Sequence, residues 1–556
     1  MLTKNCKQCG AQFQITDNDL KFYDKMSPVF DDKKYAIPSP DQCPPCRMRQ
    51  RMIFRNESSL HHRKCSKTGK NIIAMYDENV PFPVYCPEVW FGDSWDPHDY
   101  AQDFDFNRPF FEQFVELRDK VPHLSLVSSN NQNCDFCNIV GESKDCYLTF
   151  GSIECENCYY GTPFRCKRCC DSLLLRNSEL CIQCTDSDKL YECIYCQNCS
   201  NSHGLKFCYG VHNSYDCFSC VNLNHGKYCI LNKQYTKEEY EKILSGIDLT
   251  KDEVLKDVIS KLENLKMELP HRCYIGTNNE DVSGNYIFNC KDCHDVYGVS
   301  ECRDTNHSYQ MLGVNDCMDS NSGEYGELVY EVVAFFSSVN RVAFSAFVWD
   351  SIDSVYYSAQ CNKNVKDCFG CVGLKHSQYC ILNKQYTKTE YEKMVARIIE
   401  HMQRTATPSG GSSSEWGQFF PASVSIFAYN ESAASDYYPL SKEEVLKQGF
   451  KWKEIEGAEN KDARDVLICE VTGKPFRIIL QEKAMYEKFR LALPKRSPKQ
   501  RHLDRIALRN PMVLWDRKCD KCGVLMRTSY SPDRHASRQA GPEKVYCEKC
   551  YLEVVY

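Results

Sequence analysis

The spacing of the cysteines constrains this chain more than any other feature of its sequence. There are 37 cysteines in 556 residues, many of them in CxxC pairs. The opening residues, MLTKNCKQCGAQF, contain no apolar leader segment, so we expect a cytoplasmic protein whose thiols stay reduced. In that setting CxxC pairs usually bind metal, and an odd cysteine total does not fit a complete set of disulfides.

Both ends of the chain carry two CxxC pairs within polar sequence. Four cysteine thiolates suit tetrahedral Zn²⁺ with no open coordination position. The sequence therefore predicts at least two structural zinc sites, with Zn²⁺ as the cofactor. The expected ligands are Cys6, Cys9, Cys43 and Cys46 at the N-terminus, and Cys519, Cys522, Cys547 and Cys550 at the C-terminus.

Each end also carries a second, altered ribbon unit. The N-terminal unit recurs from Cys469, where Thr472 replaces the second cysteine. The C-terminal unit has an early counterpart at 57–95, where Thr68 and Val89 occupy the remaining ligand positions. Each end is therefore expected to be a tandem cassette of one intact and one degenerate ribbon.

Two stretches of sequence carry a resemblance to known proteins. The first unit, with "CKQCGAQFQI" and "CPPCRMRQR", resembles zinc-ribbon domains related to treble clefs. The succession of "VYC", "YCILNKQYT" and "EWGQFFP" resembles a group of uncharacterised cysteine-rich, multi-zinc-ribbon proteins of uncultivated bacteria. The resemblance implies zinc at the four N-terminal cysteines and implies no reaction. The substitutions at Thr68, Val89 and Thr472 depart from this pattern and leave metal binding by the degenerate units open.

The middle of the chain is a cysteine-rich repeat. Cysteines between 134 and 229 recur at intervals of three and nine, among short strand-forming runs and turn-forming clusters. Short strands at regular intervals are typical of a solenoid, and two nine-residue segments would give about 18 residues per turn. A second module, 273–385, shares the nonapeptide "YCILNKQYT" with the first.

The cysteines of this repeat have two interpretations. As metal ligands, Cys134, Cys137, Cys155 and Cys158 would form a further CxxC…CxxC site with a spacing known from zinc ribbons. As core residues, they would stack inside a narrow solenoid, which we favour for lone cysteines such as Cys146. For the CxxC pairs the two interpretations stand about even. An iron–sulfur cluster or a thioredoxin-like redox pair fits the spacing less well.

We expect a multi-domain, mainly β protein with helices, in which zinc-ribbon cassettes at both ends flank two cysteine-rich β-solenoid-like repeat modules capped by helices. The capping helices follow each copy of the nonapeptide, where Thr and Glu form a capping box. The expected segments are an intact ribbon (1–56), a degenerate ribbon (57–95), a helical connector (96–133), the first repeat module (134–233), capping helices (234–272), the second module (273–385), a capping helix (386–403), a linker and aromatic-rich segment (404–464), a degenerate basic ribbon (465–515) and an intact ribbon (516–556).

Basic residues gather in the cassettes although the formal net charge of the chain is −6. Residues 474–518 contain 13 Lys and Arg against four Asp and Glu. Basic side chains near zinc knuckles can contact phosphates, but they can also form an ordinary solvated face. The candidate nucleic-acid contacts are Arg47, Arg49, Arg51, Lys495, Arg496, Lys499, Arg501, Arg505 and Arg509.

No catalytic signature is present: the sequence contains no P-loop, G-x-G-x-x-G, G-x-S-x-G or H-E-x-x-H motif. All-cysteine zinc sites are closed and structural, so we expect a protein that is not an enzyme. Two functions remain as hypotheses. The first is a zinc-stabilised protein that binds RNA or DNA through its basic cassettes, and the second is a protein-interaction scaffold that uses the solenoid as a docking surface. Neither hypothesis involves a membrane or a small-molecule substrate.

Overall fold

The computed structural model describes residues 1–405, 414–454, 466–533 and 543–555. Over these residues the chain is mainly β with helices, and it carries a cysteine cluster at each end, as expected. The chain divides into two compact units. Unit 1 comprises Met1–Ser125, Tyr274–Glu454 and Met512–Leu514, and unit 2 comprises Leu126–Cys273, Ile455–Pro511 and Trp515–Tyr556. Of the predicted linker and aromatic-rich segment (404–464), residues 406–413 and 455–464 lie outside the described residues.

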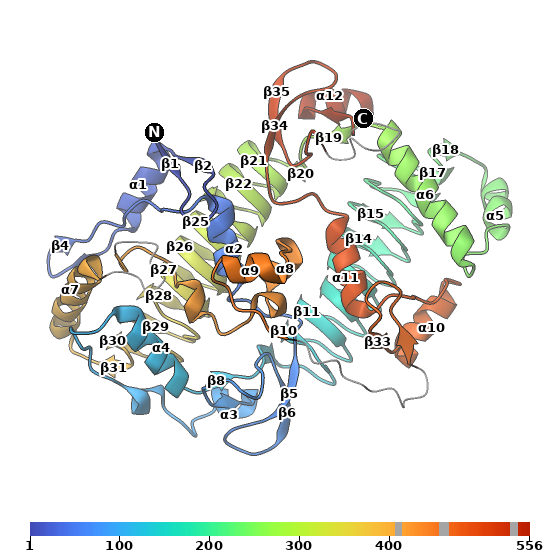
Figure 1. The fold of residues 1–556 in the computed structure, drawn as a ribbon. Coiled ribbons are helices and arrows are strands. Elements are labelled where there is room, and N and C mark those ends of the chain that lie inside the picture. The colour runs from blue at the N-terminus through green and yellow to red at the C-terminus, as the bar shows by residue number, and fades with distance from the viewer. Residues whose placement is uncertain (406–413, 455–465, 534–542, 556) are drawn as a thin grey trace. The chain divides into compact units, whose positions relative to one another are not determined.

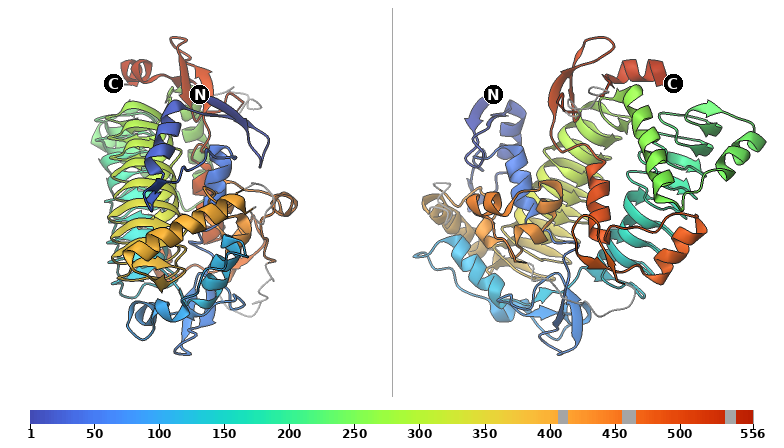
Figure 2. Two further views of the ribbon diagram at one scale, coloured as in Figure 1. Left: turned by 90° about the vertical axis from the view of Figure 1, so that its left-hand side faces the viewer. Right: turned by 45° about the vertical axis from the view of Figure 1, so that its right-hand side comes forward.

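Unit 2 is built on a stack of short parallel strands, which we call the first stack. Its strands pair in chain order, each with the next, and appear as successive rungs in Figures 1 and 2. They are β9 (Ser128–Ser129), β10 (Asn138–Gly141), β11 (Tyr147–Ile153), β12 (Tyr159–Phe164), β13 (Cys170–Arg176), β14 (Asp188–Tyr191), β15 (Ser200–His203), β16 (Tyr215–Phe218) and β17 (Lys227–Ile230).

The repeat along this stack is twelve residues, not the eighteen expected from the cysteine intervals. Asn138 pairs with Phe150, for example, and hydrogen bonds between neighbouring rungs join residues 12 apart. The intervals of three and nine are two parts of this one repeat. We call one twelve-residue turn of the stack a rung. A cysteine and its neighbour three residues later lie in the same rung, and the interval of nine then leads to the first cysteine of the next rung.

Every third residue of the first stack has a left-handed backbone, which explains the interval of three. Asn177, Leu180, Gln183, Asp186 and Lys189 all have φ between 46° and 56°. Each such residue turns the chain, so the side chain that follows it points into the stack. The interior is narrow, and small side chains suit it because close packing leaves little room.

Cysteines fill most of this interior. All but Cys170 of the cysteines between 134 and 229 belong to, or pack against, a single buried cluster that also contains leucine and valine. The lone cysteines Cys146, Cys208 and Cys229 lie in this core, so the expectation of stacked core thiols is confirmed for them.

Serines inside the stack join one rung to the next. The Ser202 hydroxyl donates to the carbonyl of Ser200 at 2.7 Å and accepts the backbone N–H of Ser214 at 3.0 Å. Ser178 and Ser187 make the same two contacts with their own neighbours. A hydroxyl at this position therefore satisfies a buried N–H group that no carbonyl reaches.

Replacing Ser202 with alanine is expected to lower the free energy of unfolding of unit 2 by about 1–3 kcal/mol, because the buried N–H of Ser214 loses its acceptor. Ser202→Cys keeps a weak acceptor at the same place and is expected to lose less. Amide hydrogen exchange at Ser214, together with urea denaturation, measures both effects. Equal exchange rates in the two variants would contradict the role given to the hydroxyl.

Two glycines allow one rung in each stack to be a residue shorter. Gly161 has φ of 127°, and a Cβ there would lie 1.8 Å from the carbonyl oxygen of Ser172. Gly284 has φ of 140° and the same close approach, 1.9 Å, to Val296. The strand register shifts beside both glycines. Only glycine fits such a backbone and such a contact.

Unit 1 contains the second stack, which is also parallel and in chain order. Its interior holds valines together with cysteines, and its central strands reach ten residues. The strands are β20 (Gly276–Thr277), β21 (Glu280–Phe288), β22 (Lys291–Ser300), β23 (Arg303–Asn306), β24 (Tyr309–Met311), β25 (Val314–Gly323), β26 (Gly326–Phe335), β27 (Val339–Val348), β28 (Ile352–Tyr356), β29 (Val365–Phe369) and β30 (Gln378–Ile381).

The repeated nonapeptide ends each stack. It forms a tight antiparallel hairpin, with β18 (Lys233–Gln234) folding back on β17 and β31 (Lys384–Gln385) folding back on β30. Both central hairpin residues are left-handed in each copy, as a two-residue hairpin turn requires. The amide side chains of Asn232 and Asn383 bond the N–H and carbonyl of the valine eleven residues earlier. These amide side chains therefore provide hydrogen-bond partners for backbone groups at the end of each stack.

Helices follow both hairpins, as expected. Thr236 and Thr387 form capping boxes with the glutamates three residues later. In unit 2, α5 (Lys237–Ser245) and α6 (Asp252–Glu268) pack their apolar residues against the outer face of the first stack. In unit 1, α7 (Lys388–Arg404) follows the second stack and places Tyr391 against Tyr379 of the last rung.

The aromatic-rich segment 415–440 packs within unit 1. Trp416 and Phe420 contact Tyr357 of the second stack, and Phe420 also stacks on Phe114 of α4 (Phe110–Lys120). The carboxylate of Glu415 accepts the first two N–H groups of α4 at 2.8 and 2.9 Å. This segment is therefore part of the core of unit 1.

The cassettes do not belong to the same unit as the stack that adjoins them in sequence. Residues 1–95 group with the second stack in unit 1, whereas the described part of 465–556, except Met512–Leu514, groups with the first stack in unit 2. Each unit therefore combines one cassette with one stack from a distant part of the chain.

Candidate functional site

All four ribbons share one turn at their first cysteine. The N–H groups of Cys6, Cys65, Cys469 and Cys519 each bond the carbonyl five residues later, and the glycine four residues later bonds back to the cysteine carbonyl. Those glycines have φ between 67° and 75°. Such a turn directs backbone N–H groups toward the sulfur.

The ribbons also share the position of their second half. The residue after the first cysteine bonds the carbonyl two positions before Cys43, Cys86, Ser497 or Cys547. A helix begins directly after each of these four residues: α2 (Pro44–Met52), α3 (Pro87–Phe91), α11 (Pro498–Ala507) and α12 (Glu548–Val555). Ser497 therefore stands where the intact N-terminal ribbon has Cys43.

Each of the four ribbons also contains a two-stranded antiparallel hairpin around its first cysteine. The intact N-terminal ribbon also holds α1 (Asp17–Met26) and the short strands β3 (Val29–Phe30) and β4 (Lys33–Lys34), and the third ribbon holds α10 (Leu480–Lys488). The remaining strands are β1 (Leu2–Asn5), β2 (Gln12–Ile15), β5 (His61–Lys64), β6 (Asn71–Ala74), β7 (Val84–Tyr85), β32 (Leu467–Ile468), β33 (Pro475–Phe476), β34 (Trp515–Lys518), β35 (Leu525–Thr528) and β36 (Val545–Tyr546).

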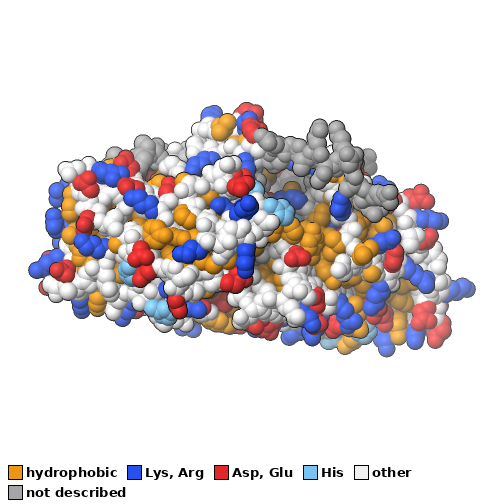
Figure 3. Space-filling view, turned by 90° about the horizontal axis from the view of Figure 1, so that it is seen from below, with side chains coloured by type: hydrophobic (Ala, Val, Ile, Leu, Met, Phe, Trp, Pro, Cys, Tyr) orange, Lys and Arg blue, Asp and Glu red, His pale blue; other side chains and the backbone are white. Residues whose placement is uncertain are grey.

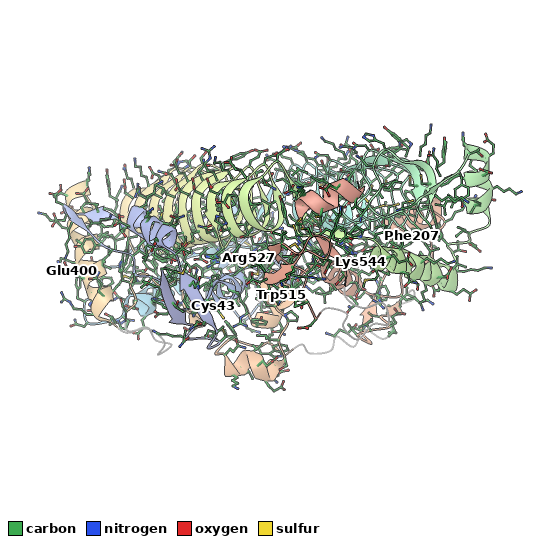
Figure 4. All side chains as sticks on the ribbon, turned by 90° about the horizontal axis from the view of Figure 1, so that it is seen from above. Cys43, Phe207, Glu400, Trp515, Arg527 and Lys544 are labelled. Carbon is green, nitrogen blue, oxygen red and sulfur yellow. The ribbon has the colours of Figure 1, made fainter. Side chains whose placement is uncertain are left out.

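Two four-cysteine groups have the geometry of metal sites. The sulfurs of Cys6, Cys9, Cys43 and Cys46 all lie within 4.8 Å of one another, and so do those of Cys519, Cys522, Cys547 and Cys550. We call each CxxC turn of a ribbon a knuckle. Between the two knuckles of each ribbon, the sulfurs of Cys9 and Cys43 are 3.7 Å apart and those of Cys522 and Cys547 are 3.8 Å apart. Figure 4 labels Cys43 on the N-terminal ribbon. The structure thus brings together all eight cysteines predicted at the two ends.

The electrostatics of each group favour the thiolate form of one cysteine. A hydrogen bond from Cys46 is the main reason that the pKa of Cys43 is lowered to about 5. Burial raises the pKa of Cys519, but N–H groups of Cys547, Cys522 and Lys521 outweigh it and lower that pKa to about 6. Burial raises the pKa of Cys9 and of Cys547. Thiolates are the form that binds metal, so each group holds one cysteine that is readily deprotonated.

The degenerate ribbons keep the turn and lose sulfur ligands. The ribbon at 57–95 retains Cys65 and Cys86, and the ribbon at 465–515 retains only Cys469. Among the described residues, the cysteines of these two ribbons belong to no group that could hold a metal ion.

Four of the predicted nucleic-acid contacts are instead buried ion pairs. In unit 1, α2 inserts Arg47 and Arg51 against the second stack. Arg47 lies 2.7 Å from Asp319, and Arg51 lies 2.6 Å from Glu331. Burial raises the pKa of Asp319, but the two arginines outweigh it and hold that pKa below its usual range. Both guanidinium groups are engaged inside the fold.

Unit 2 repeats this arrangement on the first stack. Here α11 inserts Arg501 and Arg505, which pair with Asp171, and Arg501 also lies 2.7 Å from Glu482. Arg51, Asp171 and Glu482 are fully buried, and the other arginines of the two networks are at most 5% exposed. We call these two networks the arginine clamps.

Cys170, Asp171 and Glu482 form a third group with ligand-like spacing. Arg501 already bonds both carboxylates, so the positive charge at this point comes from the protein itself. The group is part of the arginine clamp of unit 2.

Most of the other predicted basic contacts also pair within the fold, and the Arg509 and Asp186 side chains are only 8% and 4% exposed. Arg49 bonds Gln448, and Arg509 lies 3.0 Å from Asp186. Lys495 pairs with Asp252, and Arg496 lies 2.7 Å from Glu470. Lys499 is exposed. Figure 3 shows basic and acidic side chains interspersed over the face in view, without a continuous basic area.

The structure does not bring together the third predicted cysteine quartet, Cys134, Cys137, Cys155 and Cys158. Cys134 and Cys158 lie two rungs apart with Cys146 between them, because each rung takes twelve residues. Neighbouring strands are about 4.8 Å apart, so these sulfurs are separated by about twice that distance. Cys137 donates to the carbonyl of Asp135 and contacts Thr149. The CxxC spacing in the first stack arises because two successive inward-facing positions of one rung are three residues apart.

The carboxylates of the clamps were not predicted from the sequence. Asp319, Glu331, Asp171 and Glu482 carry no motif, and their arginine partners lie far from most of them in sequence. The repeated spacing R-x-x-x-R at 47–51 and 501–505 was the available signal. Residues four apart share one face of a helix, and both copies begin at the same place after the second knuckle.

Comparison with known proteins adds little. No family model matches the chain, and no curated protein matches it. One solved structure with some similarity is described as a "putative acetyltransferase from Desulfovibrio desulfuricans G20", at 8% identity and a TM-score of 0.11. The match covers 44% of this chain and 65% of that one, so the chain spans less than two thirds of its length. A TM-score this low supports no conclusion about fold or activity.

Among the described residues, no helix is both long and apolar enough to cross a membrane.

Proposed function

We propose that this chain is a non-enzymatic protein-interaction scaffold, in which two β-solenoids present docking surfaces and zinc-loaded ribbon cassettes hold them rigid. The parallel strands paired in chain order support the solenoid assignment, since each rung pairs with the next at an offset of 12 residues in the first stack and 12 or 13 in much of the second. Four soft sulfur donors without an open position support zinc as the metal and a structural role for it.

The arginine clamps are the observation that carries this proposal. A cassette built to bind nucleic acid would present its arginines to solvent, where they can reach phosphates. Here the paired arginines of α2 and α11 are buried against carboxylates of the stacks. The cassettes therefore use their basic residues to fix a solenoid in place, and the outward sides of the solenoid remain as the surface.

One side of the first stack offers a regular surface for a protein partner. Eight side chains stand in register on successive rungs, and we call them the outer column: Lys144, Glu156, Lys167, Glu179, Tyr191, His203, Tyr215 and Lys227. Charges alternate along its first half. Tyr191 and Tyr215 are 46% and 45% exposed, and exposed tyrosines are common anchors of protein interfaces.

The test compares two surface variants with the wild-type chain in affinity capture and in mobility-shift assays at two salt concentrations. The column variant carries Tyr191→Ser and Tyr215→Ser, and the cassette variant carries Lys495→Ser and Lys499→Ser. Arg501 and Arg505 stay unchanged because their loss would disturb folding. We expect the column variant to lose specific protein partners that the cassette variant keeps.

The same experiment tests nucleic-acid binding, the other function that the sequence suggests. A salt-sensitive mobility shift that the cassette variant loses and the column variant keeps would favour RNA or DNA and would overturn the scaffold proposal. Lys495, Arg496 and Lys499 would then carry the phosphate contacts.

A further inference from the structure

The ribbon at 57–95 retains two cysteines, one from each knuckle. In the intact C-terminal ribbon the corresponding residues are Cys519 and Cys547. The N–H of Cys547 bonds the Cys519 sulfur at 3.2 Å, and the N–H of Cys86 bonds the Cys65 sulfur at 3.4 Å. Since the sulfurs of Cys519 and Cys547 lie within 4.8 Å of each other, this shared contact places Cys65 and Cys86 as a neighbouring pair.

We propose that Cys65 and Cys86 are an oxidation site that closes to an intramolecular disulfide when a hydroperoxide reacts with Cys65. The other two ligand positions of this ribbon hold Thr68 and Val89, so no four-thiolate metal site competes for the pair. The knuckle residues 66–69 are exposed while the two cysteines are buried. A small oxidant therefore suits this site better than a protein disulfide.

The surroundings give the two thiols different roles. Burial raises the pKa of Cys65, but the Thr68 hydroxyl and the N–H groups of Cys86, Thr68 and Lys67 outweigh it and lower that pKa to about 7. Burial also raises the pKa of Cys86 to about 11, and its hydrogen bond to Cys65 adds to this rise. Cys65 is therefore the attacking thiolate and Cys86 the resolving thiol.

The chemistry balances with the hydroperoxide as the only oxidant. The Cys65 thiolate attacks the peroxide, the O–O bond breaks, and the leaving alkoxide takes a proton, which leaves a sulfenic acid on Cys65. The Cys86 sulfur then attacks Cys65, the S–O bond breaks, and hydroxide leaves with the Cys86 proton as water. Two thiols thus lose two electrons and two protons, and the hydroperoxide becomes an alcohol and water, or two waters.

The remaining degenerate ribbon provides an internal control. Cys469 has the same turn and a threonine at the same position, Thr472. Burial raises its pKa, but Thr472 and nearby N–H groups lower it to about 6. Ser497 takes the place of the resolving cysteine, so Cys469 can form a sulfenic acid and has no partner within its ribbon to form a disulfide.

The experiment treats the metal-loaded full-length chain with hydrogen peroxide and maps its peptides by mass spectrometry without reduction. We expect a crosslink between the peptides of Cys65 and Cys86 before metal is released from the two four-cysteine groups. Cys86→Ser is expected to abolish the crosslink and to leave a sulfenic acid on Cys65 that a dione reagent traps. Thr68→Val is expected to slow the reaction, as is lowering the pH below 7, since both reduce the thiolate fraction.

Several results would overturn the proposal. One is the absence of a crosslink at peroxide doses that already release metal. Another is sulfinic acid on Cys65 of the wild-type chain with Cys86 still reduced. Circular dichroism of the Cys86→Ser variant distinguishes loss of the crosslink from loss of the fold, and Thr68→Val preserves both thiols if that variant is unstable.

Discussion

Removing the metal from the two four-cysteine groups is expected to unfold both intact ribbons and to leave the stacks folded. Structural zinc supplies about 10–16 kcal/mol to zinc-finger peptides at neutral pH, far more than a ribbon of short two-stranded hairpins gains from its own small core. The stacks have continuous buried interiors of their own and do not depend on the metal. Metal analysis is expected to find two zinc ions per chain, one for each group.

The measurement is hydrogen exchange of the whole chain before and after treatment with a chelator. Peptides from 1–52, 515–533 and 543–555 should lose protection, and peptides from the strands β13 and β26 should keep theirs. Cys46→Ser should reproduce the effect at the N-terminal ribbon alone. Cys469→Ser is the matched control, because its ribbon holds no four-cysteine group, and it should leave the metal content unchanged. Four or more zinc ions per chain would instead assign metal to the stacks.

Breaking an arginine clamp is expected to be the most damaging single substitution away from the metal sites. Arg51→Ala leaves Glu331 and Asp319 buried with one arginine between them. Removing one partner of a buried ion pair typically costs about 3–5 kcal/mol, because the remaining charge stays desolvated. We expect Arg501→Ala to have a similar effect on unit 2, where Asp171 and Glu482 lose the guanidinium that bonds both.

The effect of each substitution can be measured by hydrogen exchange of the unit that contains the clamp. Exchange of the strands β25 and β26 should increase in Arg51→Ala, and exchange of β13 should increase in Arg501→Ala. Arg49→Ala changes a neighbouring arginine of α2 that is only partly buried, and it should cost much less. The double variant Arg51→Met/Glu331→Met removes both charges and is expected to recover part of the loss. Equal losses in Arg49→Ala and Arg51→Ala would contradict the clamp.

Much of the local structure follows from residues that are close in sequence. The CxxC spacing predicted the two four-cysteine groups because both cysteines of a knuckle belong to one turn, and the glycine after it allows that turn. The Thr–Glu pairs predicted the capping boxes for the same reason. Cysteine intervals of three and nine indicated a repeat, but their grouping into rungs of twelve depends on which strands pair.

Two features depended on packing between distant parts of the chain. The partition that places 1–95 with the second stack and the C-terminal cassette with the first has no local signal in the sequence. The role of Arg47 and Arg51 likewise depended on carboxylates more than 260 residues away. By composition those arginines looked like a phosphate-binding surface.

The sequence by itself determined the two four-cysteine groups at the ends, since the cysteines of each group lie on two short turns of a single ribbon. It also determined where each stack ends, because the nonapeptide contains the hairpin turn, the asparagine that satisfies the last rung and the cap of the next helix. Only the tertiary structure decided the fate of the remaining cysteines and arginines. Whether a thiol binds metal or fills a core, and whether an arginine faces solvent or a buried carboxylate, depends on which neighbours the folded chain places beside it.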